Sequence, residues 1–286
     1  MTSVAATSSD RYCVMGNPVA HSRSPWIHAR FAELCGQDLR YERQHVELDG
    51  FAEAVRAFVT AGGRGCNVTV PFKLEAAQLA TTSSERVQLA GAANTLVLAA
   101  DGIHADNTDG LGLVADIVRN AGVPLAGRDL LLLGAGGAAA GALGSLLAER
   151  PRRIAVVNRT FERAQALVQR HAAIAAQHGV ELVALEQQAV DEDFDVVINA
   201  TASSLAGAEV PVPARVLRTG SLAYDMMYGP AGQGFMQWAE QHGATARDGL
   251  GMLVEQAAES FALWRGVRPP SAQVLNELRA HIAQGG

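Results

Sequence analysis

The segment GCNVTVPFK, residues 65–73, has polar side chains at a spacing that could bind a small ligand. In an extended strand alternate side chains share a face, so Asn67 and Thr69 would point to one side and the neighbouring valines to the other. Pro71 suits the first turn of a helix, which would leave Lys73 near the end of the strand. We therefore expect an amide, a hydroxyl and an amine to meet at one place.

A second pair of polar side chains lies in NPVAHSRSP, residues 17–25, where Ser22 and Ser24 are two positions apart. Two hydroxyls at this spacing can both donate to a carboxylate. Serines just before a proline are also common turn or capping residues, so the spacing alone leaves both roles open.

A glycine turn follows the apolar run DLLLL and opens a segment of helical character. Gly134, Gly136 and Ala139 fit the pattern G-x-G-x-x-A in the strand-to-helix context that this motif requires. Such glycines let the backbone approach a pyrophosphate, and the N–H groups at the helix start attract its charge. The turn predicts a dinucleotide site, with a packing turn that binds no ligand as the alternative.

The residues after the next expected strand, Asn158, Arg159 and Thr160, indicate which dinucleotide binds. An acidic residue there would accept hydrogen bonds from a ribose 2′-hydroxyl and favour NAD. A guanidinium pairs with a phosphate instead, so Arg159 predicts NADP as the cofactor. Arg163 would add a second charge on the same face if the helix has begun by Arg159. Two solvated surface arginines are the alternative.

The elements that must position these groups alternate between strand-like and helix-like stretches, which is an α/β pattern. From residue 129 the alternation is that of a doubly wound parallel sheet. A chain of 286 residues is long for one core. We expect residues 1–107 to form a substrate-binding and catalytic domain and residues 108–248 an NADP-binding domain. The helices of residues 249–286 should pack back on the first.

The region between these two parts should contain a hairpin and then a helix. AANTLVLAADGIHADNTDG has two strand-like runs around a turn, which predicts the hairpin. GLGLVADIVRNAG has the spacing of one amphipathic helix, and we expect Asn107 to Asp109 to form its cap region.

The composition excludes several classes of protein. A formal net charge of −6 provides no general field for nucleic acid. Three cysteines without CxxC spacing, and eight histidines without a metal-binding pattern, predict neither a disulfide framework nor a structural metal. The N-terminus lacks the pattern of a signal peptide, so we expect a cytoplasmic protein. Residues 130–148 are uncharged, but their five glycines favour a buried strand and turn over a membrane helix.

Nine motifs together resemble the shikimate dehydrogenase family, which includes shikimate and quinate dehydrogenases, over nearly the whole chain. They stand in the family's order and at about its spacing, and chance does not plausibly supply nine motifs in register. The motifs are GNPVAHSRSP, GCNVTVPFK, GAANTLV, NTDG, GAGGAAAG, NRT, INAT, YDMMYGP and GLGMLVEQA.

The resemblance implies a Rossmann-type NADP domain and the reversible, NADP-linked oxidation of shikimate to 3-dehydroshikimate, a step toward chorismate and the aromatic amino acids. It leaves a monomer or a homodimer open. It implies that Ser22 and Ser24 hold the substrate carboxylate and that Lys73 and Asp109 form the catalytic pair. Positions that match the family's other substrate contacts are Asn67, Thr69, Asn94, Tyr228 and Gln256. Positions that match its cofactor contacts are Gly134, Ala135, Gly136, Gly137, Ala138, Asn158, Arg159, Thr160, Arg163, Met226 and Gly249.

The chemistry of the catalytic pair can be argued from the residues themselves. When hydride leaves a secondary alcohol the hydroxyl proton must leave too, so a proton-transfer group must touch that oxygen. An ammonium such as that of Lys73 is a poor base unless its pKa is lowered, and a neighbouring Asp109 would favour the charged form. Which of the two takes the proton and which orients the hydroxyl therefore stays open.

Simpler roles exist for three of these residues, because Asp109 could cap a helix, Asn94 could serve a turn and Gln256 could face solvent. The resemblance favours the functional roles, since each residue falls within its own motif. The chain departs from the family after Tyr228, where YGPAGQGF has Gln233 and Gly234 in place of the threonine and the following small-to-proline step often seen before the phenylalanine. The details of the loop near the nicotinamide are therefore open.

Two other functions compete with this interpretation. A quinate or dual-specificity enzyme would have to accept an extra hydroxyl beside the carboxylate. The Ser22 and Ser24 pair resembles the shikimate-selective form, and Arg159 opposes the use of NAD. A non-catalytic nucleotide sensor with the same fold is the second alternative. We would expect a sensor to lose its proton-transfer groups, and this chain retains both Lys73 and Asp109.

Overall fold

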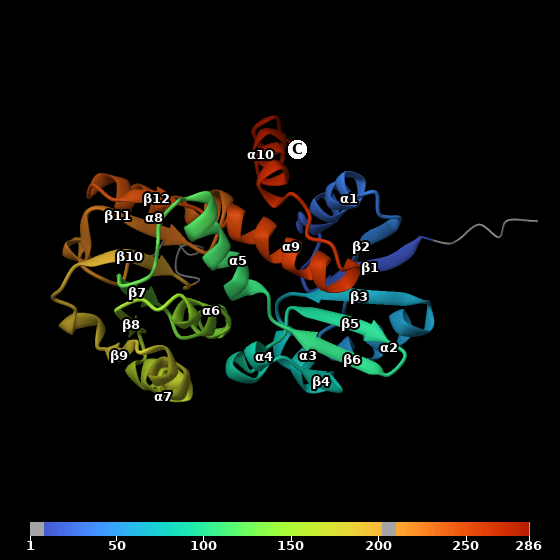
Figure 1. The fold of residues 1–286 in the computed structure, drawn as a ribbon, viewed down its shortest axis with the longest axis horizontal. Coiled ribbons are helices and arrows are strands. Elements are labelled where there is room, and N and C mark those ends of the chain that lie inside the picture. Colours follow the sequence, from blue (N-terminus) through green and yellow to red (C-terminus); the bar gives the residue numbers. More distant parts are fainter. Residues whose placement is uncertain (1–8, 202–209, 286) are drawn as a thin grey trace, which may run out of the picture. The chain divides into compact units, whose positions relative to one another are not determined.

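The computed structural model describes residues 9–201 and 210–285, which form two compact units (Figure 1). Unit 1 comprises residues 9–87, 92–107 and 257–285, and unit 2 comprises the described residues of 88–91 and 108–256. Each unit contains one six-stranded sheet with helices, so the predicted α/β class is confirmed.

The sheet of unit 1 is mixed, with the strand order β2-β1-β3-β5-β6-β4. Strand β1 pairs in parallel with β2 and β3, whereas β5 runs antiparallel to β3 and β6. The expected hairpin is the β5–β6 pair, and that prediction is confirmed. The strands are β1 (Asp10–Gly16), β2 (Leu39–His45), β3 (Gly63–Val68), β4 (Thr82–Ser83), β5 (Thr95–Ala99) and β6 (Gly102–Asp106).

Side chains alternate between the two faces of the sheet along β1, and both sets are apolar, so both faces can be covered by helices. Cys13 and Met15 face a core that includes Phe51 and Phe72, and Tyr12 and Val14 face the opposite way. Helices α1 and α10 lie side by side and are joined by the ion pair of Arg30 and Glu277 at 2.6 Å (Figure 1). The helices are α1 (Ser24–Cys35), α2 (Phe51–Thr60), α3 (Lys73–Leu79), α4 (Glu85–Ala90), α9 (Leu250–Arg265) and α10 (Ser271–Ala283). Helix α9 begins in unit 2 and passes into unit 1 after Gln256, and α4 also has residues in both units.

The sheet of unit 2 is wholly parallel, with the order β12-β11-β10-β7-β8-β9. Numbered within the unit this is 3-2-1-4-5-6 read from β9, the doubly wound order of dinucleotide-binding folds. Its strands are β7 (Asp129–Leu133), β8 (Arg153–Val157), β9 (Glu181–Leu185), β10 (Phe194–Asn199), β11 (Leu217–Asp225) and β12 (Thr245–Arg247). Its helical segments are α5 (Asp109–Ala115), η1 (Asp116–Asn120), α6 (Gly137–Ala148), α7 (Phe161–His178), η2 (Gln187–Ala189), η4 (Ala214–Val216), η5 (Gly229–Gly232) and α8 (Gln233–Gln241).

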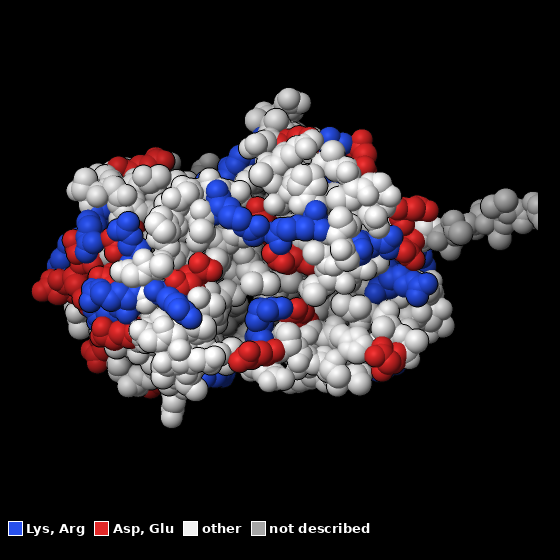
Figure 2. Space-filling model, in the orientation of Figure 1, with Lys and Arg blue, Asp and Glu red and all other residues white. Residues whose placement is uncertain are grey.

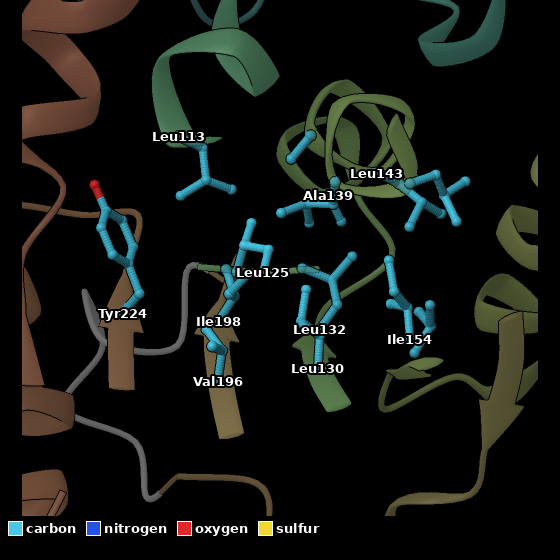
Figure 3. Packing of buried hydrophobic residues seen from close by; sticks show 14 of the residues in the cluster. Leu113, Leu125, Leu130, Leu132, Ala139, Leu143, Ile154, Val196, Ile198 and Tyr224 are labelled. Atoms are coloured by element: carbon cyan, nitrogen blue, oxygen red, sulfur yellow. The ribbon is translucent and has the colours of Figure 1, made fainter. Parts of the chain in front are cut away.

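The core of unit 2 lies between the sheet and the helices that cover it. Figure 3 shows Leu132 and Ile198 pointing from their strands toward Leu113, Ala139 and Leu143 on the helices. The uncharged stretch of residues 130–148 is therefore strand β7, the glycine turn and helix α6, as expected. Within the described part of the chain, no helix has the length and apolar character needed to cross a bilayer.

Basic and acidic side chains occur together on the face of the surface drawn in Figure 2. Many of them pair locally. Arg218, for example, lies 2.9 Å from Asp193 and 2.8 Å from Asp195. Pairs as exposed as these contribute little to stability.

Three expected element boundaries differ from the structure. Strand β3 ends at Val68, and Pro71 lies in the following turn after a cis peptide bond, so α3 begins only at Lys73. The expected single helix after the hairpin is α5 followed by the π-helical segment η1. Thr108 precedes α5 but has helical backbone angles, and it forms no side-chain cap. Its hydroxyl instead donates to Oε1 of Gln256 at 3.5 Å.

Candidate active site

Most of the predicted substrate-binding residues of unit 1 lie at one edge of its sheet. The carboxyl ends of β1 and β3 meet there because the two strands are parallel. Strand β5 is antiparallel to β3, so its first residue, Thr95, lies opposite Asn67 at the same edge. The segments that leave β1 and β3 and the one that enters β5 therefore meet the sheet at the same edge, and they carry Ser22, Ser24, Thr69, Lys73 and Asn94.

The segments after β1 and β3 are hydrogen-bonded to each other beyond the ends of the strands. The backbone N–H of Thr69 donates to Met15 O at 2.9 Å, and that of Asn17 donates to Val70 O at 3.0 Å. A Cβ atom at Gly16 would overlap the Thr69 methyl group. The glycine thus lets Thr69 pack directly against the end of β1.

The two serines lie at the start of α1. Ser22 Oγ accepts a hydrogen bond from the backbone N–H of Ser24 at 3.3 Å, so it has the turn role that its sequence position left open. This bond uses a lone pair of Ser22 and not its proton. Arg43 donates two hydrogen bonds to the carbonyl oxygen of Ser22, at 2.6 and 2.9 Å, which places a positive charge beside the serine pair.

The Asn67 amide faces into the unit and is only 6% exposed. Its Oδ1 accepts from the hydroxyl of Tyr41 at 2.7 Å. Its Nδ2 lies 3.0–3.2 Å from the carbonyl oxygen of Asn94 and the hydroxyls of Thr95 and Ser260. Asn67 therefore holds the start of β5, and with it the backbone of Asn94, by hydrogen bonds from the neighbouring strand β3.

Lys73 is the first residue of α3 and is half-buried. Its carbonyl oxygen accepts from Ala93 N at 2.8 Å, and the next residue, Asn94, donates its N–H to Asp106 O at 3.1 Å. These bonds fix the backbone of Lys73 beside that of Asn94. The ends of β3, β5 and β6 thus fix the backbone position from which the Lys73 side chain extends.

The glycine turn of unit 2 leaves an open cradle at the carboxyl edge of the parallel sheet. Gly134 has a φ of +108°, which favours glycine, and its N–H donates to Val157 O at 2.7 Å. Gly136 and Gly137 are exposed, and no heavy atom lies within 4 Å of where their Cβ atoms would be. The turn opens the 12-residue helix α6 and lies between β7 and β10, where the strand order reverses. A pyrophosphate fits this place by both space and dipole.

The residues after β8 support this turn and add positive charge. Asn158 Oδ1 accepts from Ala135 N at 3.2 Å, and its Nδ2 donates to Thr160 O at 2.8 Å. Arg159 and Arg163 are both exposed. Because α7 begins at Phe161, Arg159 precedes the helix and the expected shared helical face of the two arginines is not formed. Both still follow the carboxyl end of β8, as an adenosine phosphate site requires.

A third group of predicted residues lies where β11 ends. The N–H of Met226 donates to Asn199 O at 3.0 Å, which holds it beside the end of β10. Gly249 donates its N–H to Met227 O at 2.9 Å, and a Cβ atom there would overlap Met226 O. Tyr228 follows directly and is half-buried. Met226, Gly249 and the Tyr228 backbone are thus brought together.

The packing of α5 on α9 links Gln256 to Thr108, the residue before Asp109. Asp109 is the first residue of α5 and is 8% exposed. The preceding Thr108 donates to Gln256 Oε1, whose Nε2 in turn donates to Leu253 O at 2.8 Å. A Cβ atom at Gly112 would lie 2.6 Å from Gln256 N, so the two helices touch through their backbones.

Sequence analysis did not single out a buried polar network beside this helix pair. Asp116 is fully buried and accepts from the Tyr224 hydroxyl at 2.8 Å and from Arg247 at 2.6 and 2.8 Å. Burial raises the pKa of Tyr224 well above its usual range, and the nearby Asp116 charge acts in the same direction. The sequence indicates this network only by an aspartate flanked by apolar residues, in the stretch LVADIV.

Comparison with known proteins identifies the family. Domain-family models match residues 14–96 (shikimate dehydrogenase substrate binding domain), 116–210 (shikimate / quinate 5-dehydrogenase) and 249–279 (shikimate 5'-dehydrogenase C-terminal domain). The chain is 76% identical over 278 residues to the shikimate dehydrogenase (NADP(+)) of Acidovorax sp. strain JS42, which covers 97% of this chain and 99% of the relative. The chain belongs to the shikimate dehydrogenase family. The resemblance found in the nine motifs is therefore confirmed.

Solved structures agree with this assignment. Shikimate 5-dehydrogenase from Thermus thermophilus, in complex with NADP(H) and shikimate, superposes with a TM-score of 0.81 at 31% identity, covering 95% of this chain and 99% of that one. The ligand-free 5-ketofructose reductase of Gluconobacter sp. strain CHM43 gives a TM-score of 0.80 at 28% identity, over 94% of this chain and 99% of that one. The fold thus also occurs in an enzyme named for another substrate.

Proposed function

We propose that this protein catalyses the reversible, NADP-dependent oxidation of shikimate to 3-dehydroshikimate. The observation that carries the proposal is the 76% identity, over 97% of the chain, to a relative named shikimate dehydrogenase (NADP(+)). The fold alone would be insufficient support, since 5-ketofructose reductase shares it. The grouping of polar side chains at one edge of the unit 1 sheet adds independent support.

In unit 1 the substrate carboxylate is bound by Ser22 and Ser24, with the charge of Arg43 nearby to favour an anion. Thr69 and Asn94, at the same edge, contact ring hydroxyls. Asn67 supports them from below. Residues 1–107 together with 249–286 serve the substrate, and residues 108–248 bind the cofactor.

The reacting hydroxyl is bound by Lys73 and Asp109, with Tyr228 and Gln256 as further contacts. Both members of the pair start helices, α3 and α5, so their backbones are fixed by the strand ends before them. One takes the hydroxyl proton and the other orients the oxygen, because the proton must leave as the carbon is oxidised.

NADP accepts the hydride when it is bound. The backbone from Gly134 to Ala138 holds its pyrophosphate at the start of α6. Arg159 and Arg163 pair with the 2′-phosphate, and Asn158 and Thr160 shape the loop that carries them. Met226 and Gly249 line the nicotinamide end.

The test is absorbance at the reduced-nicotinamide band with shikimate or quinate, each with NADP or NAD. Turnover mainly with shikimate and NADP is the expected result. Turnover mainly with quinate or NAD would contradict the proposed specificity but not the fold. No change of absorbance in any of the four mixtures would favour a nucleotide sensor. Lys73→Met and Asp109→Asn should each lower kcat by about 10²–10⁴-fold. NADP binding, followed by fluorescence titration, should remain unchanged.

The remaining proposals concern where and in what form the enzyme works. We propose a cytoplasmic enzyme that acts on small molecules and has no nucleic acid or membrane partner. Its state is a monomer or a homodimer, and analytical ultracentrifugation distinguishes the two. A sedimentation coefficient that rises with protein concentration toward that of a dimer would decide for the homodimer.

A further inference from the structure

Helix α1 packs against strand β2, and the buried ring of His28 lies on the face of α1 that meets this strand. Tyr41 of β2 lies against this face, with its ring stacked on that of His28 at a centroid distance of 4.2 Å and an angle of 5°. Its hydroxyl donates to Asn67 Oδ1 at 2.7 Å. Tyr41 thus contacts α1 through its ring and strand β3 through its hydroxyl.

His28 serves this arrangement as a flat, uncharged ring. It is fully buried, and neither ring nitrogen has a hydrogen-bond partner of normal geometry among the described residues. Trp264 and Phe31 pack against it at centroid distances of 5.3 and 5.9 Å, in addition to Tyr41. Such contacts fix the plane of the Tyr41 ring and hence the direction of its hydroxyl.

The hydrogen bonds around the Tyr41 hydroxyl have a defined direction. Its proton goes to Asn67 Oδ1 at 2.7 Å, and Asn67 Nδ2 in turn donates to the carbonyl oxygen of Asn94 at 3.2 Å. The phenol stays neutral and keeps this proton, because burial raises the pKa of Tyr41 well above its usual range. Tyr41, Asn67 and Asn94 therefore form one chain of hydrogen bonds.

We propose that Tyr41 is a positioning residue for substrate binding, which holds the Asn67 amide, and through it Asn94, in place before the substrate arrives. The inference rests on the proposed function, because that function assigns a ring hydroxyl of the substrate to Asn94. A side chain that is already ordered loses less entropy when a ligand binds. Removing the phenol hydroxyl should therefore weaken binding of the substrate without changing the chemical step.

The test compares Tyr41→Phe with the matched variant Tyr12→Phe. Tyr12 belongs to the same apolar cluster and packs on Trp264 at a ring-centroid distance of 4.8 Å. Its hydroxyl accepts a hydrogen bond from Arg265 at 3.3 Å, and Arg265 is not a predicted substrate ligand. Loss of one neutral hydrogen bond corresponds to a change of roughly three- to tenfold in affinity. We expect the KM for shikimate to rise by about that factor in Tyr41→Phe, with kcat within about twofold and the KM for NADP unchanged. Tyr12→Phe should leave all three constants unchanged.

A double variant tests whether Tyr41 acts through Asn94. In an Asn94→Ala background, Tyr41→Phe should raise the KM for shikimate by much less than it does in the parent. An undiminished effect would overturn the route through Asn94. His28→Leu removes the ring on which Tyr41 stacks but leaves its hydroxyl, so it should raise the same KM and provides a second variant if Tyr41→Phe does not fold.

The outcomes separate this inference from the proposed function. If the parent protein does not oxidise shikimate with NADP, both fail. If the parent turns over normally and Tyr41→Phe has an unchanged KM for shikimate, the inference alone fails. It also fails if kcat and the KM for NADP change together with the KM for shikimate, or if Tyr12→Phe has the same effect, because general loosening of unit 1 would then explain the result.

Discussion

Replacing His28 with phenylalanine should remove a defined part of the pH dependence of stability. Burial lowers the pKa of His28 to about 3 from the ordinary 6.5, against a smaller opposite effect of the Asn67 amide. Below about pH 6.5, His28 therefore binds a proton in the unfolded chain but not in the folded chain. The sign follows: His28 favours folding fully above that pH, and its contribution is lost as the pH falls. Phenylalanine retains a ring that can stack on Tyr41 but cannot titrate.

The magnitude follows from the two pKa values of His28. Between about pH 7.5 and 5.5 the unfolded histidine becomes mostly protonated while the folded one does not, which costs about 1.3 kcal/mol. At about pH 5.5 this figure hardly depends on the folded pKa, because any value below roughly 4.5 gives nearly the same result. Other groups, including the carboxylates and His171, titrate in both proteins and cancel when the two are compared.

The assay is urea unfolding of the parent and His28→Phe at both pH values and one salt concentration. Trp26 and Trp264 lie in unit 1 and Trp238 in unit 2, so a Trp238→Phe background makes tryptophan fluorescence report on the unit that contains His28. The parent should lose about 1.3 kcal/mol more than the variant. Equal losses in the two proteins would refute the reasoning, because His28 would then titrate in the folded state as it does in water.

Two further predictions concern unit 2. Gly251→Ala should destabilise unit 2 by about 3 kcal/mol or more, because the new Cβ atom would overlap the carboxylate of the buried Asp116. Gly234→Ala, at a helical position with open space, should be neutral or stabilise by about 0.5–1 kcal/mol. Urea unfolding followed by circular dichroism compares the two variants with the parent. Arg159→Ala should raise the KM for NADP by about 10–100-fold in steady-state assays and leave that for NAD nearly unchanged. An equal rise for both cofactors would contradict the assignment of Arg159 to the 2′-phosphate.

Local patterns in the sequence predicted most of the architecture. The run Leu130 to Leu133 with the glycines after it predicted β7, the turn and α6, because both the strand and the turn depend on neighbouring residues. The β5–β6 hairpin and the parallel sheet followed from the same kind of reasoning. Grouping of the polar residues at one edge was foreseeable as well, since parallel strands present their carboxyl ends together.

Long-range contacts limited what the sequence could predict about the site. Asn67 was expected to share a face with Thr69 in an extended strand, but β3 ends between them and the two side chains have different surroundings. The partners of Asn67 include Ser260, which lies 193 residues away, and a strand pattern does not indicate such a contact. Tyr41 was missed for the same reason, because its importance comes only from what packs on either side of it.

The glycines of two recognised motifs have a packing role that explains their spacing. In NTDG and the residues after it, Gly110 would meet α6 and Gly112 would meet α9 if either had a Cβ atom. In GLGM, Gly249 lies on the Met226 carbonyl and Gly251 on Asp116. Contact between backbones leaves little freedom for one helix to shift along the other. Asp109, at the start of α5, and Gln256, on α9, therefore keep a fixed relation. These glycines serve the site by holding its side chains in place, whereas Gly136 and Gly137 serve it by leaving space for a ligand.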